Sequence, residues 1–272
     1  MTNINGKTSV YSLLAQSTTH SLSPLIHNFS AECLGLNAVY IPMPYAGDNL
    51  GEFLKVADDI NLQGFNVTVP FKEEVANALG LTGSSINTVY RKDGQWAATS
   101  TDAEGFCNGL SKMKKNIEDF ENIVFLGNGG AALALASYMY DKYDIAVHVV
   151  RRSVSRDSLF PKASSFYEFS LDGLKAALKG RKGTLLVQST SAPLSGNSLK
   201  ELVPAIEDLN GCFVDLVYKT PSALFYEAER RGLPCIDGLP MLVEQAVLSQ
   251  KYWWGESVDS NLIYEFLDRN GV

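Results

Sequence analysis

A run of small residues directly after an apolar strand constrains the fold of this chain most. Residues 127–132 read Gly-Asn-Gly-Gly-Ala-Ala, follow the apolar segment Ile123–Leu126 and open a predicted helix. This matches G-x-G-x-x-A, in which the first glycine makes a tight turn and the second lets the backbone approach a pyrophosphate. The helix N-terminus also attracts negative charge. The sequence therefore predicts a Rossmann-type domain. The residues expected to contact a dinucleotide are Gly127, Asn128, Gly129, Gly130 and Ala131.

Basic residues end the next predicted strand, Ala146–Val150. Arg151, Arg152 and Ser153 follow it directly, and Arg156 lies shortly beyond. In the NAD fingerprint this strand end carries an acidic residue for the ribose hydroxyl. Guanidinium groups suit a 2′-phosphate instead, because arginine meets phosphate through two parallel hydrogen bonds. A solvated basic turn would have the same composition, but its position at this strand end favours NADP over NAD.

Alternating strands and helices along the chain predict an α/β fold with parallel pairing. In the first third the expected strands are Val10–Leu14, Val39–Met43 and Phe65–Val69, and the expected helices are Pro24–Leu34, Leu50–Ala57 and one opened by Pro70. Later the expected strands are Ile123–Leu126, Ala146–Val150, Leu185–Val187 and Cys212–Leu216, and the helices are Ala131–Tyr143, Leu171–Leu178, Ser222–Arg231 and two amphipathic stretches after Pro240. We expect two α/β domains, residues 1–107 and 108–240, with a ligand-binding cleft between them. Helices in residues 241–272 are expected to return to the first domain.

Composition excludes several classes of function. The net charge is -7 and no basic run occurs, so nucleic acid is not an expected partner. No apolar stretch reaches the roughly 18 residues of a membrane span. The cysteines are widely spaced and fit free thiols in a reducing cytoplasm; they are Cys33, Cys107, Cys212 and Cys235. With only His20, His27 and His148 besides, we expect no metal site.

Polar residues gather at strand ends and tight loops of the first domain. Ser21 and Ser23 precede a predicted helix, where their hydroxyls either cap it or hold a carboxylate. Thr68 shares a strand face with Asn66. Lys72 lies in the first turn of the next predicted helix, against the helix dipole. This lysine is therefore either solvated or a proton donor tuned for catalysis.

Several motifs occur in one order. Residues 20–28 read HSLSPLIHN, residues 66–72 NVTVPFK, residues 86–89 INTV, residues 101–106 TDAEGF, and residues 237–246 DGLPMLVEQA. Around the glycine run, these motifs closely resemble the shikimate dehydrogenase family, and the likeness extends across nearly the whole chain. Several turns depart from the family. In one of them, residues 188–190 read Gln-Ser-Thr where Asn-Ala-Thr is usual.

The resemblance implies an oxidoreductase that uses NADPH for the reversible reduction of 3-dehydroshikimate to shikimate, a step of chorismate and aromatic amino-acid biosynthesis. It implies that residues 1–107 bind the substrate and carry the catalytic pair, Lys72 and Asp102. The lysine ammonium would donate a proton to the developing alkoxide during reduction. The implied substrate contacts are Ser21 and Ser23 at the carboxylate, Tyr218 near it, and Thr68, Asn87 and Gln245 at the ring hydroxyls. The further implied cofactor contacts are Leu216 through its backbone, and Gly238 and Met241 beside the nicotinamide.

Alternative functions remain open at this point. A sister enzyme would act on quinate or an aminated analogue, with a broader substrate range. A catalytically silent paralogue would bind a nucleotide or a partner protein, and Asp102 would then be an ordinary helix cap. Both serines and the arginines favour shikimate and NADP, and the intact Lys72 and Asp102 favour an enzyme. We expect a cytoplasmic protein, a monomer or a homodimer, with a small-molecule substrate.

Overall fold

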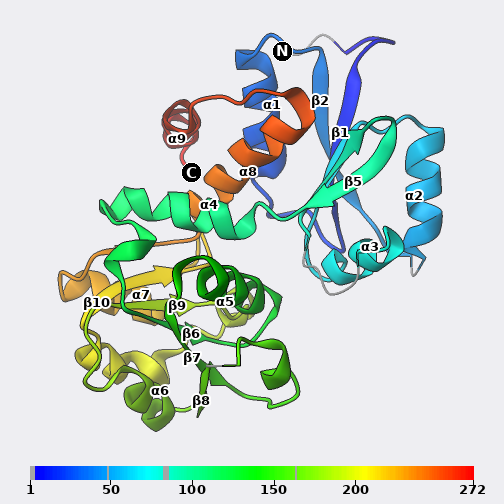
Figure 1. Cartoon of the computed structure of the whole chain (residues 1–272). Helices are drawn as coiled ribbons and strands as arrows, with labels where there is room; N and C mark the ends of the chain where they lie inside the picture. The colour runs from blue at the N-terminus through cyan, green and yellow to red at the C-terminus, as the bar shows by residue number, and fades with distance from the viewer. Residues whose placement is uncertain (1–3, 48, 82–85, 163) are drawn as a thin grey trace. The chain divides into compact units, whose positions relative to one another are not determined.

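The chain divides into two compact units in the computed structural model, which describes residues 4–47, 49–81, 86–162 and 164–272. One unit comprises Met1–Thr101 with Val243–Val272, and the other comprises Asp102–Leu242 (Figure 1). The first division falls at Thr101 rather than at residue 107 because helix α4 (Asp102–Gly109) buries two of its side chains in the core of the second unit. The α/β class with two units is confirmed, whereas the cleft between domains stays a prediction.

The first unit contains a mixed sheet. Its strands are β1 (Ser9–Ala15), β2 (Ala38–Pro44), β3 (Gly64–Val67), β4 (Thr88–Lys92) and β5 (Gln95–Thr99). Their order is β2-β1-β3-β4-β5. The pairs of β1 with β2 and with β3 are parallel, but β4 runs antiparallel to both of its neighbours. The parallel pairing expected for the three predicted strands is confirmed, whereas β4 and β5 were not predicted.

A two-residue hairpin explains the antiparallel strands. Asp93 and Gly94 connect Lys92 to its partner Gln95, and both have positive φ, 52° and 78°. Two positive φ values are what a type I′ turn requires, and Asp-Gly is its strongest sequence signal. The sequence therefore contains a local signal for the hairpin, although neither of its strands was predicted.

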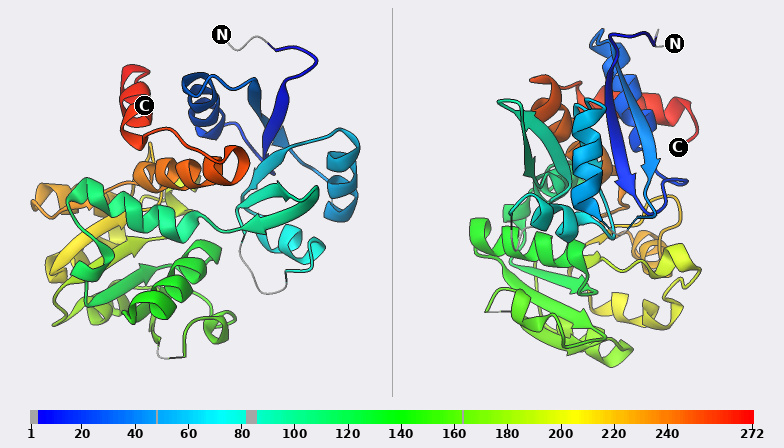
Figure 2. Two further views of the ribbon diagram at one scale, coloured as in Figure 1. Left: turned by 45° about the horizontal axis from the view of Figure 1, so that its top comes forward. Right: turned by 90° about the vertical axis from the view of Figure 1, so that its right-hand side faces the viewer.

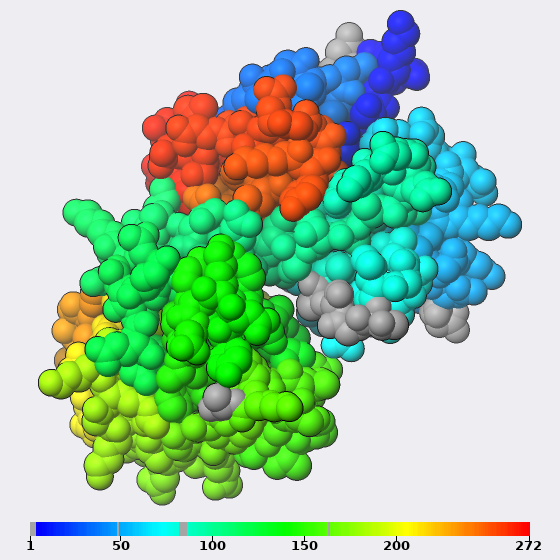
Figure 3. Space-filling view, viewed as in Figure 1, coloured from blue at the N-terminus to red at the C-terminus, as the bar shows by residue number. Residues whose placement is uncertain are grey.

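Helices cover both faces of this sheet. Helices α2 (Leu50–Asp59) and α3 (Lys72–Ala78) lie against the face that buries Phe65. Helix α1 (Ser23–Cys33) and the end of α8 (Leu239–Trp254) cover the opposite face, around Tyr11. Helix α9 (Ser260–Arg269) joins α1, since the rings of Phe266 and Phe29 stack with centroids 4.0 Å apart. The C-terminal helices thus lie beside the first helix in this unit (Figures 2 and 3).

The second unit has the strand order of a dinucleotide-binding fold. Its strands are β6 (Asn122–Leu126), β7 (Ala146–Arg151), β8 (Ser165–Glu168), β9 (Thr184–Gln188), β10 (Gly211–Asp215) and β11 (Cys235–Ile236). They pair in parallel in the order β11-β10-β9-β6-β7-β8. Counted from β6, this is the doubly wound order 3-2-1-4-5-6, in which ligands bind where the order reverses. That point lies at the carboxyl ends of β6 and β9.

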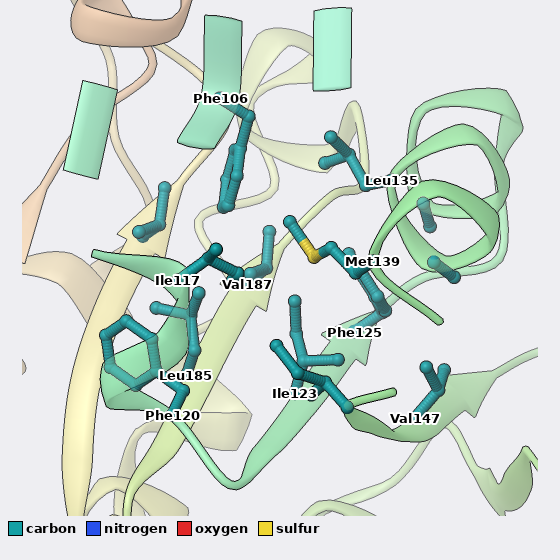
Figure 4. Close-up of a cluster of buried hydrophobic side chains, with 14 of the residues drawn as sticks. Phe106, Ile117, Phe120, Ile123, Phe125, Leu135, Met139, Val147, Leu185 and Val187 are labelled. Atoms are coloured by element: carbon teal, nitrogen blue, oxygen red, sulfur yellow. The ribbon is translucent and has the colours of Figure 1, made fainter. Parts of the chain in front are cut away.

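Two layers of helices enclose the second sheet. Helices α4 and α5 (Gly130–Tyr143) pack on one face, with Phe106, Leu135 and Met139 meeting in the core (Figure 4). Helices α6 (Leu171–Leu178) and α7 (Ala223–Arg230) pack on the other face. Two short 3-10 segments, Leu110–Met113 and Ile117–Asp119, connect α4 to β6. Strands β8 and β11 were not predicted because they are short edge strands without a clear apolar period.

Two buried histidines make stability depend on pH. Burial lowers the pKa of His27 to about 3, and burial together with the neighbouring Arg181 lowers that of His148 to about 4. Because these values lie below the usual 6.5, the unfolded chain binds more protons than the folded one. Stability is therefore full above about pH 6.5 and falls as the pH drops from there towards 4, by about 1.4 kcal/mol per pH unit for each histidine.

We expect the variant His27→Phe to lose less stability than the wild type between pH 7 and pH 5. Urea unfolding at both pH values measures this, and the difference between the two proteins should be roughly 1–2 kcal/mol. Phenylalanine keeps the ring stack on Tyr40, whose centroid lies 4.4 Å from that of His27. Equal losses in the two proteins would show that His27 is not the titrating group.

Candidate functional site

The glycine turn after β6 has the backbone that the sequence pattern predicts. Gly127 has a φ of 115°, which side chains other than hydrogen rarely permit. A Cβ atom at this position would lie 2.7 Å from the Cγ2 of Thr190. Gly127 therefore meets two demands at once, a positive φ and close packing of the loop that follows β9.

The N-terminus of α5 is open where a ligand would approach. Gly129 is the N-cap residue, and neither it nor Gly130 has an atom within 4 Å of the place of a Cβ. Ala132 is fully buried, which lets the helix pack closely on the sheet. The Nδ2 of Asn128 donates a hydrogen bond to the backbone oxygen of Ser153 at 2.8 Å, so the turn is tied to the end of β7. A pyrophosphate fits this arrangement of exposed backbone amides.

The arginines after β7 differ in their availability. Arg151 is half-buried and forms a bidentate ion pair with Asp157, with Nε and Nη2 2.7–2.9 Å from the carboxylate oxygens. Arg152 is exposed and lies over the ring of Phe169, 4.5 Å from its centroid. Ser153 is exposed in the same turn, and Arg156 precedes a short 3-10 segment. Arg152 is thus the guanidinium best placed to meet an anion from solvent.

The loop after β10 meets the start of α8. A Cβ on Gly238 would lie 2.2 Å from the backbone oxygen of Leu216, so only glycine fits there. The start of α8 also packs on α4, since a Cβ on Gly109 would come within 3.2 Å of the backbone nitrogen of Met241. Tyr218, two residues after Leu216, is half-buried. The structure therefore brings Leu216 and Gly238 together, although 22 positions separate them in the sequence.

In the first unit, a buried group of polar side chains surrounds Asn87. Its Nδ2 donates to the Oγ1 of Thr101 at 2.9 Å and to the Oε1 of Gln245 at 3.0 Å. Its Oδ1 accepts the backbone N–H of Thr101 at 2.8 Å. Because a backbone N–H can only donate, it determines which end of the Asn87 amide carries oxygen, and Asn87 in turn orients the oxygen of Gln245.

Three further members of this group were not singled out as functional. Thr88 and Ser249 are fully buried and lie within hydrogen-bond distance, 2.8 Å between their hydroxyl oxygens. Asn66 donates from Nδ2 to the backbone oxygen of Asn87 at 3.0 Å. The sequence signal for Asn66 and Thr88 was present in the two motifs that contain them. Ser249 carries no such signal, because only the packing of α8 brings it to β4.

The serines before α1 bond to each other rather than cap the helix in the usual way. The Oγ of Ser21 accepts the backbone N–H of Ser23 at 3.2 Å, and Ser23 is 6% exposed. The N-cap position itself is taken by Leu22, which has no side-chain acceptor. The two serines therefore lie together at the N-terminus of α1, as expected.

The lysine motif forms a turn before its helix begins. Strand β3 ends at Val67, and the backbone N–H of Phe71 donates to the oxygen of Thr68 at 3.0 Å. Helix α3 consequently begins at Lys72 and not at Pro70, so that start was predicted too early. Lys72 is half-buried in the first turn. Asp102, the first residue of α4, is 9% exposed.

No group of three or more histidine, cysteine, aspartate or glutamate side chains is arranged to hold a metal ion within the part of the chain that the structure describes. Likewise, none of the described helices combines the length and the apolar character that a membrane crossing needs.

Comparisons with known proteins agree with these features. A sequence profile described as "Shikimate dehydrogenase substrate binding domain" matches residues 13–87. A curated protein of Trichormus variabilis named "Shikimate dehydrogenase (NADP(+))" is 34% identical over an alignment of 277 positions. The alignment covers 92% of each chain.

Solved structures show the same architecture. The shikimate 5-dehydrogenase of Thermus thermophilus, in complex with NADP(H) and shikimate, has a TM-score of 0.79 at 27% identity and covers 96% of this chain and 99% of its own. A quinate dehydrogenase of Corynebacterium glutamicum in complex with NAD has a TM-score of 0.80 at 22% identity and covers 96% of this chain and 99% of its own. At that identity, the second likeness shows the fold alone.

Proposed function

The chain belongs to the shikimate dehydrogenase family, and we propose that it catalyses the NADP-dependent, reversible reduction of 3-dehydroshikimate to shikimate. One observation carries this proposal. The chain combines the family's Lys72 and Asp102 with a doubly wound sheet whose glycine turn is open to a dinucleotide. This combination favours an oxidoreductase over a nucleotide-binding paralogue without activity.

The chemistry needs a hydride and a proton. NADPH, when bound, supplies the hydride to the carbonyl carbon. The ammonium of Lys72 donates a proton to the oxygen that becomes negative, and the neutral amine takes this proton back when shikimate is oxidised. The carboxylate of Asp102 accepts a hydrogen bond from the substrate hydroxyl and orients it for the transfer. Both residues are catalytic in this proposal.

Polar residues of the first unit hold the substrate. Ser21 and Ser23 donate to its carboxylate, and Thr68 bonds a ring hydroxyl. Asn87 and Gln245 bond the ring hydroxyls with amides that are already oriented, Asn87 by Thr101 and Gln245 by Asn87. Such preorganisation lowers the entropic cost of holding the ring in one position. Tyr218, from the second unit, is proposed to bond the carboxylate as well.

The second unit holds NADP. The residues proposed at the pyrophosphate are Gly127, Asn128, Gly129, Gly130 and Ala131, and those at the nicotinamide are Leu216, Gly238 and Met241. Arg152, Ser153 and Arg156 bind the 2′-phosphate. We expect Arg151 to contribute less to binding of the 2′-phosphate than these three residues, because Asp157 already neutralises its guanidinium. The space above Gly129 and Gly130 fits the phosphates, since no protein atom lies within 4 Å of a Cβ placed there.

The direct test offers the purified protein shikimate and quinate, each with NADP and with NAD, and compares the initial rates. The proposal expects the highest kcat/KM for shikimate with NADP. A preference for quinate would assign the chain to a sister activity within the family. Absence of activity in all four combinations would refute the proposed reaction and favour the silent paralogue.

We expect the variant Arg152→Ala to raise the KM for NADP by about 10–100-fold, because a charge-assisted hydrogen bond to phosphate contributes roughly 1.5–3 kcal/mol. The KM for NAD, which lacks the phosphate, should change little. Steady-state kinetics with both cofactors measure this, with Arg230→Ala as a control. Arg230 is an exposed residue of α7 paired with Glu227. Equal increases for both cofactors would contradict the role of Arg152.

We further propose a cytoplasmic location and a small-molecule substrate as the only ligand besides the cofactor. The cysteines support this location, since all four are free thiols. Whether the protein is a monomer or a homodimer stays a prediction, which sedimentation or light scattering decides.

A further inference from the structure

Gln188 lies between the two strand ends that lead into the cofactor site. It ends β9 and is fully buried. In the sheet it is the register partner of Leu126, which precedes the glycine turn, and of Asp215, which precedes the loop of Leu216. The side chain of Gln188 therefore lies within reach of both the glycine turn after β6 and the loop after β10.

All the hydrogen-bonding capacity of the Gln188 amide is used within this region. Its Oε1 accepts the backbone N–H of Thr190 at 2.6 Å and the hydroxyl of Thr190 at 2.7 Å. Its Nε2 donates to the Oδ1 of Asp215 and to the backbone oxygen of Thr190, both at 3.1 Å. An amide oxygen accepts two hydrogen bonds and an NH2 group donates two, so the group is saturated.

These bonds determine where the methyl group of Thr190 points. The hydroxyl and the backbone N–H of Thr190 share one acceptor, which restricts rotation about χ1. The Cγ2 is thereby held beside Gly127, in the space that a Cβ would need. Ser189 adds a second contact, because its Oγ donates to the backbone oxygen of Leu126 at 3.0 Å. The loop after β9 thus packs against the glycine turn through Ser189 and Thr190.

The Nε2 of Gln188 connects the amide to the loop after β10 through its hydrogen bond to Asp215. Asp215 is fully buried, and its carboxylate also accepts the backbone N–H groups of Val217 at 3.0 Å and of Ser222 at 2.8 Å. The backbone N–H of Leu216 donates to the backbone oxygen of Gln188 at 2.9 Å. Gln188 therefore connects the pyrophosphate turn to the loop that packs against Gly238.

We propose that Gln188 is a positioning residue that sets the affinity for NADP by holding Thr190 against the glycine turn, without contacting the cofactor itself. The proposal rests on the proposed function, since it takes the glycine turn as the NADP site. An asparagine is one methylene shorter and cannot make the same four bonds from this backbone position.

The test uses Gln188→Asn in the full chain, with NADPH binding measured by fluorescence titration and the KM values measured in the shikimate assay. We expect the Kd for NADPH and the KM for NADP to rise about tenfold, which corresponds to loss of one or two net hydrogen bonds. The KM for shikimate should stay unchanged. A merely structural role would lower the Tm and the active fraction while leaving the Kd for NADPH as in the wild type.

Thr190→Val provides a second variant that keeps the shape of the loop. It retains a methyl group towards Gly127. It loses the hydroxyl bond to Gln188 and the weaker bond that the hydroxyl accepts from the backbone N–H of Ala192 at 3.3 Å, so we expect the Kd to rise by about two- to fivefold. Gln95→Asn, at an exposed position of β5, is the matched control. If Gln188→Asn fails to fold, Thr190→Val decides the question.

An unchanged Kd for NADPH in the folded variants would overturn the role of Gln188 while leaving the proposed function in place. Failure of the wild-type protein to bind NADPH would instead overturn the proposed cofactor, and the role of Gln188 with it.

Discussion

Lys72→Ala is expected to lower the kcat of shikimate oxidation by about 10²–10⁴-fold, the usual contribution of general acid–base catalysis. Water would then have to accept the proton of the reacting hydroxyl. Water is a weaker base than the lysine amine and is not held in position for the transfer. Lys72 begins α3 directly after the turn Thr68–Phe71, so the truncation removes a side chain without disturbing a buried core.

The measurement is the pre-steady-state and steady-state rate of NADPH formation at saturating shikimate and NADP. Lys55→Ala is the matched control, because Lys55 is an exposed lysine of the neighbouring helix α2. The Kd for NADPH of the Lys72 variant should equal that of the wild type, which separates lost chemistry from lost binding. A turnover close to that of the wild type would end the assignment of Lys72 as the proton donor.

The two glycines of the turn are expected to respond differently to alanine. Gly129→Ala should cost less than about 1 kcal/mol of stability, because the new Cβ meets open space and only the weaker N-cap preference of alanine counts against it. The methyl group would however occupy the space that a pyrophosphate needs, and the Kd for NADPH should rise by about 10–100-fold as phosphate hydrogen bonds are lost.

Gly127→Ala should instead destabilise the protein itself. Its φ of 115° is strained for alanine, and the Cβ would lie 2.7 Å from Thr190. The left-handed region alone costs about 1–2 kcal/mol for a residue with a side chain. Urea unfolding and NADPH titration of both variants distinguish the two effects, with Gly6→Ala as a control outside any contact. A loss of stability in Gly129→Ala as large as that in Gly127→Ala, or none in Gly127→Ala, would contradict the roles assigned to them.

Much of the second unit could be predicted because its signals are local. A strand of apolar residues, a glycine turn and a helix with a small residue at its start are specified within residues 123–143, and the structure places β6, the turn and α5 there. The helix Leu171–Leu178 was predicted with the observed ends. In the first unit the Asp93–Gly94 hairpin has an equally local signal, the Asp-Gly pair. The hairpin could therefore have been predicted from the sequence as well.

The partners of charged and polar side chains could not be predicted in the same way. The sequence indicated a set of arginines for a phosphate, but it did not show that Asp157 pairs with Arg151 and that Arg152 stays exposed. It indicated Asn87 and Gln245 as binding residues, but not the amide contact between them across 158 positions.

Local signals in the chain specify the α/β class, the glycine turn and the family to which the motifs belong, because backbone sterics and apolar periodicity act over a few neighbouring residues. How those parts are held together depends instead on contacts between distant residues. Gln188 contacts Asp215 from 27 positions away, and Thr190 lies against Gly127 although 63 positions separate them. Such contacts depend on which strands become neighbours in the sheet, and no local spacing in the chain specifies that order.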